Sequence, residues 1–323
     1  GGALPLRRAG ANFVALCPFH KEKSPSFNVN PQKQIFHCFG CGEGGNVYTF
    51  LMKVEGKAFP EVVRDLARRA GVEVPADRDD PGRAARTDDR DRVHEVNKAA
   101  AEFFTDVLLK HTAGRGGLEY LNRREIGREM IDKHRIGFAP GAGSALRDHL
   151  NRKGYKDELL EIAGLVGTRE HGGFIDRFRS RVIFPIITSG GHVCAFGGRT
   201  IESSAATPKY LNSPVTPAYN KSAVLYGIHA ARESLRRSGF VLLVEGYLDL
   251  VMLDQAGFGN VVATCGTALT QGHGDTIRRF TKGLHLCFDG DAAGHKAVLR
   301  AAEVLLGGDL KVKVVALPPA DDP

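Results

Sequence analysis

Two pairs of metal-ligand residues constrain the beginning of the chain more than any other feature. Cys17 and His20 are separated by two residues, as are Cys38 and Cys41, and seventeen residues lie between the pairs. Each pair can direct two side chains at one ion, and two pairs complete a tetrahedron of three thiolates and one imidazole. Residues 1–74 hold few aliphatic side chains and would be marginally stable without a metal. The spacing therefore predicts a small zinc-ribbon domain with one structural zinc.

Aromatic and basic residues surround this predicted zinc site. Such a mixture suits a single-stranded nucleic acid, whose bases stack on rings while its phosphates pair with cations. The alternative is that the rings form the small core over the metal, and we expect this of three of the five. The residues concerned are Phe13, Phe19, Phe27, Phe36 and Phe39, with Arg7, Arg8, Lys21, Lys23 and Lys33 among them.

A break in composition follows the zinc module. Residues 75–92 contain no Val, Ile, Leu or aromatic residue, so this segment cannot bury enough apolar surface to offset its ordering entropy. We expect a flexible linker there. Apolar residues at helical spacing then predict a helix over Val93–Lys110.

Charge differs between the two regions that follow. Residues 93–238 carry 22 Lys and Arg against 15 Asp and Glu, whereas residues 239–323 carry seven against ten. This asymmetry favours a polyanion partner beside a cation-binding site, with random variation of surface charge as the alternative.

The chain shows no sign of a secreted or membrane protein. Six Cys in 323 residues are too few for a disulfide framework, and no apolar run approaches the roughly 20 residues that span a bilayer. The first residues lack the apolar core of a signal peptide and a start Met. We therefore expect a cytoplasmic protein without a membrane partner, and a piece of a longer chain.

The last third of the sequence alternates between strand and helix patterns. Short apolar strands are expected at Phe240–Glu245, Asn260–Thr264, Leu284–Phe288 and Lys311–Leu317, and helices at Tyr247–Gln255, His273–Thr281 and Ala292–Leu306. Strands buried on both faces and separated by helices predict a parallel sheet covered by helices. Two further strands, Arg181–Ile187 and His192–Phe196, flank a Gly-Gly turn. The expected fold is thus α+β, with an α/β subdomain at the end and the zinc ribbon at the beginning.

Acidic residues follow two strands of this alternating region. Glu245 comes after the first strand, and Asp289 and Asp291 come after the third. The carboxyl ends of parallel strands meet at one edge, so these side chains should converge there. Hard carboxylate oxygens are the ligands that Mg²⁺ prefers. The pattern predicts a catalytic Mg²⁺ site suited to phosphoryl transfer.

Basic residues in the middle region suggest a groove for nucleic acid. Arg177, Arg179 and Arg181 alternate, so in an extended strand they would share one face and repel each other unless a polyanion lies over them. Lys209 and Lys221 lie on loop sequence punctuated by prolines, where binding residues are common. A solvated strand face and ordinary surface lysines are the alternatives.

These residues together resemble a known family. The alternating region with Glu245-Gly246 and Asp289-Gly-Asp291 is similar to a toprim domain, and the Cys/His module resembles a primase zinc-binding domain. Between them, four segments resemble the bacterial DnaG-type replicative primase: residues 177–185, 196–199, 208–214 and 225–227. The resemblance divides the chain into a zinc-binding domain (1–74), the linker (75–92), a basic N-terminal subdomain of an RNA polymerase domain (93–238) and a truncated toprim subdomain (239–323).

The resemblance implies a DNA-directed RNA polymerase that makes short RNA primers from NTPs on single-stranded DNA, with Mg²⁺ or Mn²⁺. It implies metal-binding roles for Asp249 and Asp322 beside the three catalytic acids. Its nucleotide and template groove corresponds to Arg199, Lys209, Asn212 and Lys221. It further implies a monomer, able to act in trans between molecules, and a replicative helicase partner bound through a C-terminal domain absent here.

Two other functions fit part of this pattern. A recombination-mediator protein also joins a zinc site to a toprim domain and only clamps DNA, but its ligands are typically four Cys and its chain is shorter. A toprim nuclease or topoisomerase is the second; a topoisomerase needs a reactive Tyr on a separate domain, for which none of the seven Tyr is a convincing candidate.

Overall fold

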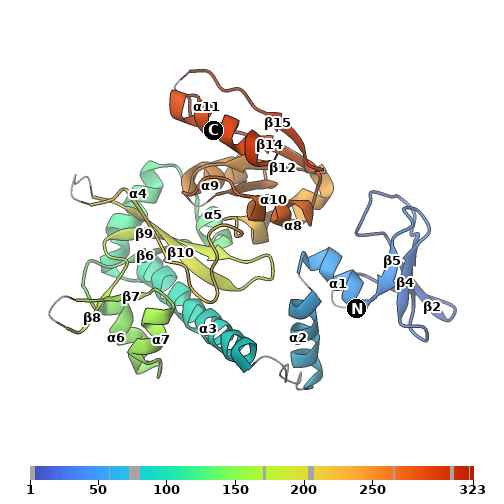
Figure 1. Ribbon diagram of the computed structural model, residues 1–323, viewed down its shortest axis with the longest axis horizontal. Coiled ribbons are helices and arrows are strands. Elements are labelled where there is room, and N and C mark those ends of the chain that lie inside the picture. Colours follow the sequence, from blue (N-terminus) through green and yellow to red (C-terminus); the bar gives the residue numbers. More distant parts are fainter. Residues whose placement is uncertain are drawn as a thin grey trace.

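The chain is described by a computed structural model (Figure 1). It covers residues 4–57, 59–72, 81–169, 172–202, 207–264, 266–305, 309–319 and 321–323, with backbone only for 81–87. In these parts no helix has both the length and the apolar character needed to cross a membrane.

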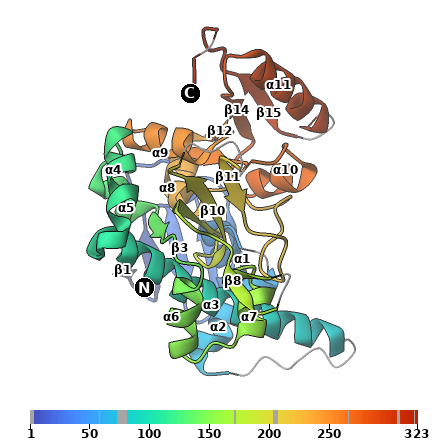
Figure 2. The same ribbon diagram turned by 90° about the vertical axis from the view of Figure 1, so that its left-hand side faces the viewer.

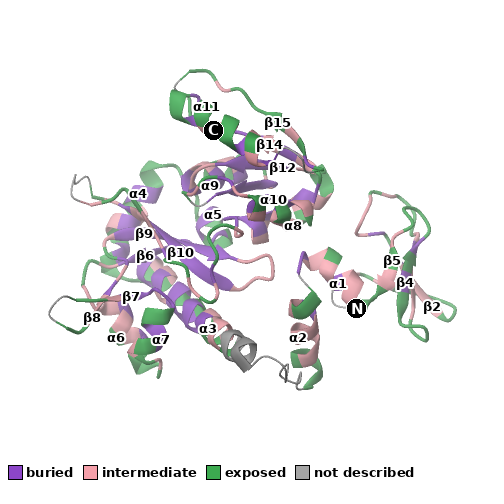
Figure 3. Ribbon diagram, viewed as in Figure 1, coloured by how far each residue is buried: buried purple, intermediate pink, exposed green. Residues whose placement is uncertain are grey.

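The N-terminal module is a five-stranded antiparallel sheet followed by two helices. The strands lie in the order β1 (Arg7–Ala9), β2 (Asn12–Ala15), β3 (Phe27–Asn30), β4 (Ile35–Cys38) and β5 (Gly44–Asn46). The helices are α1 (Val47–Glu55) and α2 (Phe59–Ala70). Along β4, Phe36 and Cys38 are buried while Ile35 and His37 are exposed, so one face of the sheet is uncovered (Figure 3). The predicted zinc ribbon is confirmed.

The aromatic residues of this module divide between core and surface. Phe27 and Phe36 stack with ring centroids 5.2 Å apart, and Phe19 and Phe50 pack around them. Phe39, in contrast, is 75% exposed. Three of the five rings therefore belong to the core, as expected: Phe19, Phe27 and Phe36. Phe13, the fifth ring, is half-buried on β2.

The expected linker is partly helical. Residues 75–80 lie outside the described part of the chain, but helix α3 spans Pro81–Lys110, so the prediction of a flexible segment is wrong for residues 81–92. Arg92 lies 4.0 Å from Asp88 and 3.8 Å from Asp89, one turn earlier. Such (i, i+3) and (i, i+4) pairs support an exposed helix that buries no apolar side chain. The absence of apolar residues excluded burial but not helix formation.

The N-terminal subdomain of the body is built on a four-stranded sheet in the order β11-β10-β9-β6. Its strands are β6 (Gly137–Ala139), β9 (Arg181–Ile187), β10 (Val193–Thr200) and β11 (Tyr210–Asn212), and a separate pair is formed by β7 (Val166–Thr168) and β8 (Phe174–Asp176). The helices are α3, the 3₁₀ turn Thr112–Gly114, α4 (Arg115–Arg123), α5 (Arg128–Lys133), α6 (Ala145–Arg152) and α7 (Asp157–Ile162). The two predicted strands of this region are confirmed.

The C-terminal subdomain is the predicted parallel sheet. Its strands lie in the order β13 (Val261–Ala263), β12 (Phe240–Val244), β14 (Gly283–Leu286) and β15 (Lys311–Val314), all parallel. The helices are α8 (Ile228–Ser238), α9 (Tyr247–Gln255), α10 (Gln271–Arg278) and α11 (Ala292–Leu305). Figure 2 shows this subdomain at one end of the body and α6 and α7 at the other. The expected α+β fold with a helix-covered parallel sheet is confirmed.

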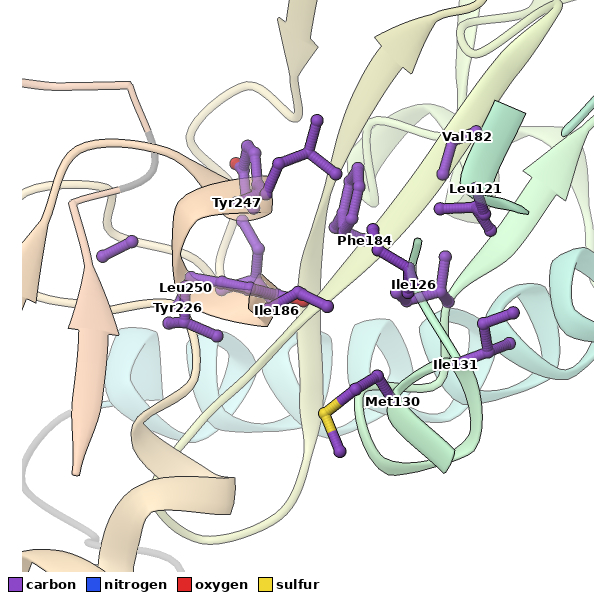
Figure 4. Packing of buried hydrophobic residues seen from close by; sticks show 14 of the residues in the cluster. Leu121, Ile126, Met130, Ile131, Val182, Phe184, Ile186, Tyr226, Tyr247 and Leu250 are labelled. Atoms are coloured by element: carbon purple, nitrogen blue, oxygen red, sulfur yellow. The ribbon is translucent and has the colours of Figure 1, made fainter. Parts of the chain in front are cut away.

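One hydrophobic cluster crosses the boundary between the two subdomains (Figure 4). Phe184 of β9 stacks on Tyr247 of α9 with ring centroids 5.1 Å apart, and Tyr226 packs edge-on against Tyr247 at 4.9 Å. Asp254 of α9 accepts hydrogen bonds from Lys133 and His134, at 2.6 and 2.7 Å. Dense packing and buried polar contacts make the two subdomains one rigid body.

The zinc module meets this body at an elbow between α1 and α2. The Ser189 hydroxyl donates to the Gly56 carbonyl at 3.2 Å, and Gly56 lies so close to the Phe280 ring that an added Cβ would be 2.2 Å from it. Lys57 is 8% exposed and its ammonium group is paired with Asp65 at 2.6 Å and with Glu55. The elbow therefore fixes the direction in which the module leaves the body.

Candidate functional site

The structure brings the four predicted zinc ligands together. The donor atoms of Cys17, His20, Cys38 and Cys41 all lie within 4.8 Å of one another. The sulfurs of Cys17 and Cys41 are 3.9 Å apart, and Cys38 Sγ is 3.8 Å from His20 Nδ1. Zinc–sulfur bonds of about 2.3 Å in a tetrahedron require sulfurs about 3.8 Å apart. The donor set and its spacing therefore fit Zn²⁺.

Glu22 ties the first ligand pair to the second. One carboxylate oxygen accepts the Cys17 and Ser26 N–H groups at 2.6 and 3.1 Å, and the other lies 3.3 Å from His20 Nε2 and accepts from the Ser26 hydroxyl. The Ser26 oxygen lies 3.1 Å from Cys38 Sγ. A carboxylate on the second nitrogen of a ligating His orients the ring and raises its basicity.

The two buried thiols of this site ionise differently without a metal. Burial raises the pKa of Cys17 to about 12. For Cys38 burial acts in the same direction, but contacts with the Ser26 hydroxyl and with the N–H groups of Cys41 and Gly40 outweigh it and lower the pKa to about 6. Since zinc binds thiolates, loading of the site releases the Cys17 proton.

The predicted acids lie at the carboxyl edge of the parallel sheet. Glu245 directly follows β12, Asp289 follows β14, and β12 and β14 are neighbours. Burial raises the pKa of Glu245, and the negative charge of Asp289 raises it further. Burial also raises the pKa of Asp289, with Asp249 and Asp322 adding to the effect. These carboxylates are therefore close enough to repel one another.

Two of the acids are also held by helix termini. Asp249 accepts the Gly246 N–H at 2.9 Å at the start of α9, and Asp291 accepts the N–H groups of Ala293 and Gly294 at 2.9 and 2.7 Å at the start of α11. Burial raises the pKa of Asp249. Among the residues that the structure describes, one Glu245 oxygen is buried and has no hydrogen-bond partner.

The acidic edge is more open than the zinc site. Among the described residues, only the Cys/His group has donors close enough to surround an ion as they stand. The hard oxygens, their mutual repulsion and the Glu245 oxygen without a described partner fit a site for a divalent cation.

The three alternating arginines do not share a strand face, so that prediction is wrong. Strand β9 begins only at Arg181, because Ser180 has a φ of 50° and interrupts the extended backbone. Arg181 is 4% exposed and donates to the carbonyls of Gly198, Lys209 and Pro208.

The other two arginines lie on the preceding loop. Arg177 donates to the Asn212 carbonyl at 3.2 Å, and Arg179 donates to the Asp176 carbonyl. All three arginines nevertheless border one open cavity of about 390 Å³, which also reaches Pro208 and Leu211. The cations thus converge through a loop and not through strand alternation.

Arg199 and Tyr120 line a second, adjacent depression, and Arg199 also contacts Tyr210; the sequence reasoning missed both tyrosines. The Arg199 guanidinium is 5.0 Å from the Tyr210 ring centroid and 5.9 Å from that of Tyr120, whose hydroxyl accepts from Arg199 Nε at 3.1 Å. The Arg124 guanidinium also lies over the Tyr120 ring, 5.8 Å from its centroid. The four-residue spacing between Tyr120 of α4 and Arg124, which caps the end of α4, was the available signal in the sequence.

Of the remaining predicted groove residues, Lys209 lies near the acids and Asn212 contacts the start of α9. Lys209 lies near Tyr210, with its ammonium 5.9 Å from the ring centroid, and its charge lowers the pKa of Asp249 and Asp289 against the raising effect of burial. Asn212 accepts a hydrogen bond from the Tyr247 hydroxyl at 2.9 Å. Lys221 is exposed on the loop before α8.

The fold and these sites define the class of protein: a zinc ribbon is followed by a catalytic body that contains a toprim domain. Three family models match in this order: CHC2 zinc finger over residues 1–81, the N-terminal domain of the DNA primase catalytic core over 103–232, and the Toprim domain over 239–316. The chain belongs to the bacterial DnaG-type DNA primase family.

Individual relatives agree with this assignment. The DNA primase of Listeria monocytogenes is 39% identical over 328 residues, which cover 100% of this chain and 52% of the relative. The chain therefore spans about half the length of that protein. The crystal structure of the Aquifex aeolicus primase zinc-binding and RNA polymerase domains matches with a TM-score of 0.67 and 35% identity, over 99% of this chain and 76% of that one.

A structure of the DnaG primase catalytic domain bound to ssDNA is also similar. It matches with a TM-score of 0.67 and 34% identity, and the alignment covers 73% of this chain and 76% of that one.

Proposed function

We propose that this chain carries the polymerase centre of a DNA primase, which synthesises short RNA primers on a single-stranded DNA template. In the reaction, a ribose 3′-hydroxyl forms a bond to the α-phosphorus of an NTP, and the bond to pyrophosphate breaks. The observation that carries the proposal is the buried, unpartnered oxygen of Glu245 at an edge where Asp289 also lies. The family assignment and the ssDNA complex of the related catalytic domain support it.

Glu245, Asp289 and Asp291 are the proposed catalytic acids, with Asp249 and Asp322 beside them. They would hold Mg²⁺ or Mn²⁺, which when bound supplies neutralising charge for the triphosphate and orients it. Lys209 is close enough to these acids for its charge to lower the pKa of Asp289 against the effect of burial. From this place it could pair with the phosphates of the NTP. No side chain is proposed as a general base.

The basic cavity is the proposed path of template and nucleotide. Arg177 and Arg179 offer cations at its border, while Arg181 supports the loop that carries Lys209. Arg199 sits between two tyrosine rings, an arrangement suited to a phosphate beside a stacked base. Asn212 and Lys221 complete the proposed set.

The uncovered face of the zinc-module sheet is a second proposed contact with the template. Pairing places Arg7, Val14, Asn28 and His37 in one row across four strands. Exposed Phe39 follows β4 and packs against His37, with ring centroids 4.8 Å apart. The module could serve its own body or that of a second copy, and a replicative helicase is a further proposed partner.

Primer synthesis on a single-stranded template tests this proposal. Asp289→Ala should abolish incorporation of labelled NTPs, because the acidic edge loses a central ligand. Asp106→Ala removes an exposed carboxylate on α3 that pairs with Lys110, and should leave synthesis unchanged. Unchanged synthesis by Asp289→Ala, with the wild type active, would refute the assignment of the edge. Binding of ssDNA without any synthesis by the wild type would favour a DNA-clamping protein.

A further inference from the structure

The first two turns of α10 hold three consecutive carbonyl groups of one loop. His273 Nε2 donates to the carbonyl of Lys221 at 2.9 Å, the Thr270 hydroxyl donates to that of Ser222, and the Thr276 hydroxyl donates to that of Ala223 at 2.7 Å. We call Lys221–Ala223 the clamped loop. Its backbone lies directly on the helix, since a Cβ added to Gly272 would be 2.5 Å from the Ser222 oxygen.

The tautomer of His273 follows from its partners. Its side chain is fully buried, and Nδ1 accepts the Thr270 N–H at 3.2 Å while Nε2 faces a carbonyl that can only accept. The ring is therefore neutral, with its proton on Nε2. Burial lowers the pKa of His273, which keeps it in this form. One ring thus joins the start of α10 to the backbone of Lys221.

The clamped loop lies at the edge that carries the acids. A helix that follows a parallel strand begins at the carboxyl edge of the sheet, and α10 follows β13, which pairs with β12. Just beyond the clamped loop, Tyr226 exchanges backbone hydrogen bonds of 2.9 and 3.1 Å with Ala263, the last residue of β13. The loop is therefore anchored to β13, the neighbour of β12, and Glu245 directly follows β12.

The Lys221 side chain contrasts with its backbone. It is exposed, and its ammonium group forms no ion pair with any side chain that the structure describes. Fixing the backbone limits the volume that a flexible lysine can sample, which concentrates its charge at one place. This arrangement suits an ammonium group that binds a phosphate group of a ligand.

We infer that His273 is a positioning residue: by hydrogen bonding to the Lys221 carbonyl, it holds the Lys221 ammonium group where it contacts a phosphate of the nucleotide or the template. This inference rests on the proposed polymerase function and adds a residue to it. His273 itself touches no substrate. The alternative is that His273 only stabilises the fold.

Replacing His273 by Gln or by Asn, whose amide groups extend to different distances, distinguishes a positioning role from a purely structural one. In the full 323-residue chain, His273→Gln can still place a donor near the Lys221 carbonyl, whereas His273→Asn keeps only the contact near the start of α10. Primer synthesis is measured as a function of NTP and of template concentration. We expect His273→Asn to raise one of the two KM values roughly three- to tenfold with a smaller change in kcat, and His273→Gln to restore most of the loss.

A double-mutant cycle with Lys221→Ala tests whether the effect passes through Lys221. If it does, His273→Asn has no further effect in the Lys221→Ala background. Independent, additive losses would overturn the inference, as would a wild-type KM for His273→Asn. Should His273→Asn fold poorly in thermal unfolding, the milder Thr276→Val, which removes the hydrogen bond to Ala223, replaces it in the same cycle, with the same two outcomes.

The two hypotheses fail differently. If the wild type makes no primers, the polymerase function itself is wrong. If the wild type makes primers but Lys221→Ala changes neither KM, only the positioning role is refuted.

Discussion

The zinc module and the catalytic body are stabilised in different ways. The buried apolar cluster of the module consists of Ala15, Cys17, Phe27, Phe36 and Cys38, so two of its five members are metal ligands. The body instead contains three larger clusters, one of which joins both subdomains. The comparison shows that metal coordination replaces packing where the chain is too short to build a core.

Removal of zinc should have the largest effect and should affect only one region. Structural zinc contributes on the order of 10 kcal/mol or more to the folding of small modules. We expect a strong chelator to unfold residues 1–74 while the body keeps its structure. Limited proteolysis measures this, with cleavage confined to the module and reversed by added Zn²⁺. Equal loss of protection in the body would contradict the comparison.

Truncation of a shared core residue should destabilise both subdomains of the body together. Phe184→Ala removes a ring that stacks on Tyr247 across their boundary, at a cost of about 3–5 kcal/mol. Urea unfolding should shift as a single transition for the body, whereas zinc content stays unchanged. The exposed Phe258→Ala is the control, since its side chain is 51% exposed. Two separate transitions in Phe184→Ala would argue against one rigid body.

The buried hydrogen bonds of Asp254 should make the next largest contribution to the free energy of unfolding of the body. Asp254→Asn removes the charge that Lys133 and His134 hydrogen bond to, at a cost of about 2 kcal/mol. Hydrogen bonds from these residues outweigh burial and lower the pKa of Asp254. Its contribution is therefore present above the unfolded pKa of about 3.9 and is lost as the pH falls through the lower folded value.

Stability measured from pH 7 downward tests this sign. The difference between wild type and Asp254→Asn should shrink only below about pH 4. A difference that grows on acidification would exclude the ionised form of Asp254 as the stabilising one.

Loss of the Glu22 carboxylate should have the smallest effect on folding and a clear one on zinc retention. Glu22→Gln weakens the contacts to His20 and to the Cys17 backbone, and changes of this kind typically reduce metal affinity at least tenfold. Competition with a chromophoric chelator measures it. Glu43→Gln alters a nearby exposed carboxylate that pairs with Lys53, and should retain wild-type affinity.

Elements with a strong local pattern were predictable. Helix α9 occupies Tyr247–Gln255, as expected, because an apolar strand and a glycine mark its beginning. Strands β12 and β13 are buried runs of apolar residues, whereas β14 alternates and β15, at the sheet edge, is mostly exposed, contrary to the expectation of burial on both faces. All four strands lie within three residues of their predicted ends. Because the carboxyl ends of parallel strands meet at one edge, this pattern also predicted that Glu245 and Asp289 lie at the same edge.

Features that depend on tertiary context were not predictable. The left-handed Ser180 breaks the alternation of Arg177, Arg179 and Arg181, and nothing in the local sequence marks that break. The approach of Tyr120 to Arg199 joins residues 79 positions apart. Pairing of Glu22 with four groups of the zinc site likewise needs the folded loop, since its charge alone suits a solvated surface.

The elbow at Gly56 and Lys57 has a consequence for the proposed template contact of the ribbon. Because it pins the ribbon to a rigid body, the sheet face of the ribbon stands at a set distance from the acidic edge. If the proposed template contact on that face holds and the module serves its own body, nucleotides bound there would be separated from the first templating base by a constant number of steps.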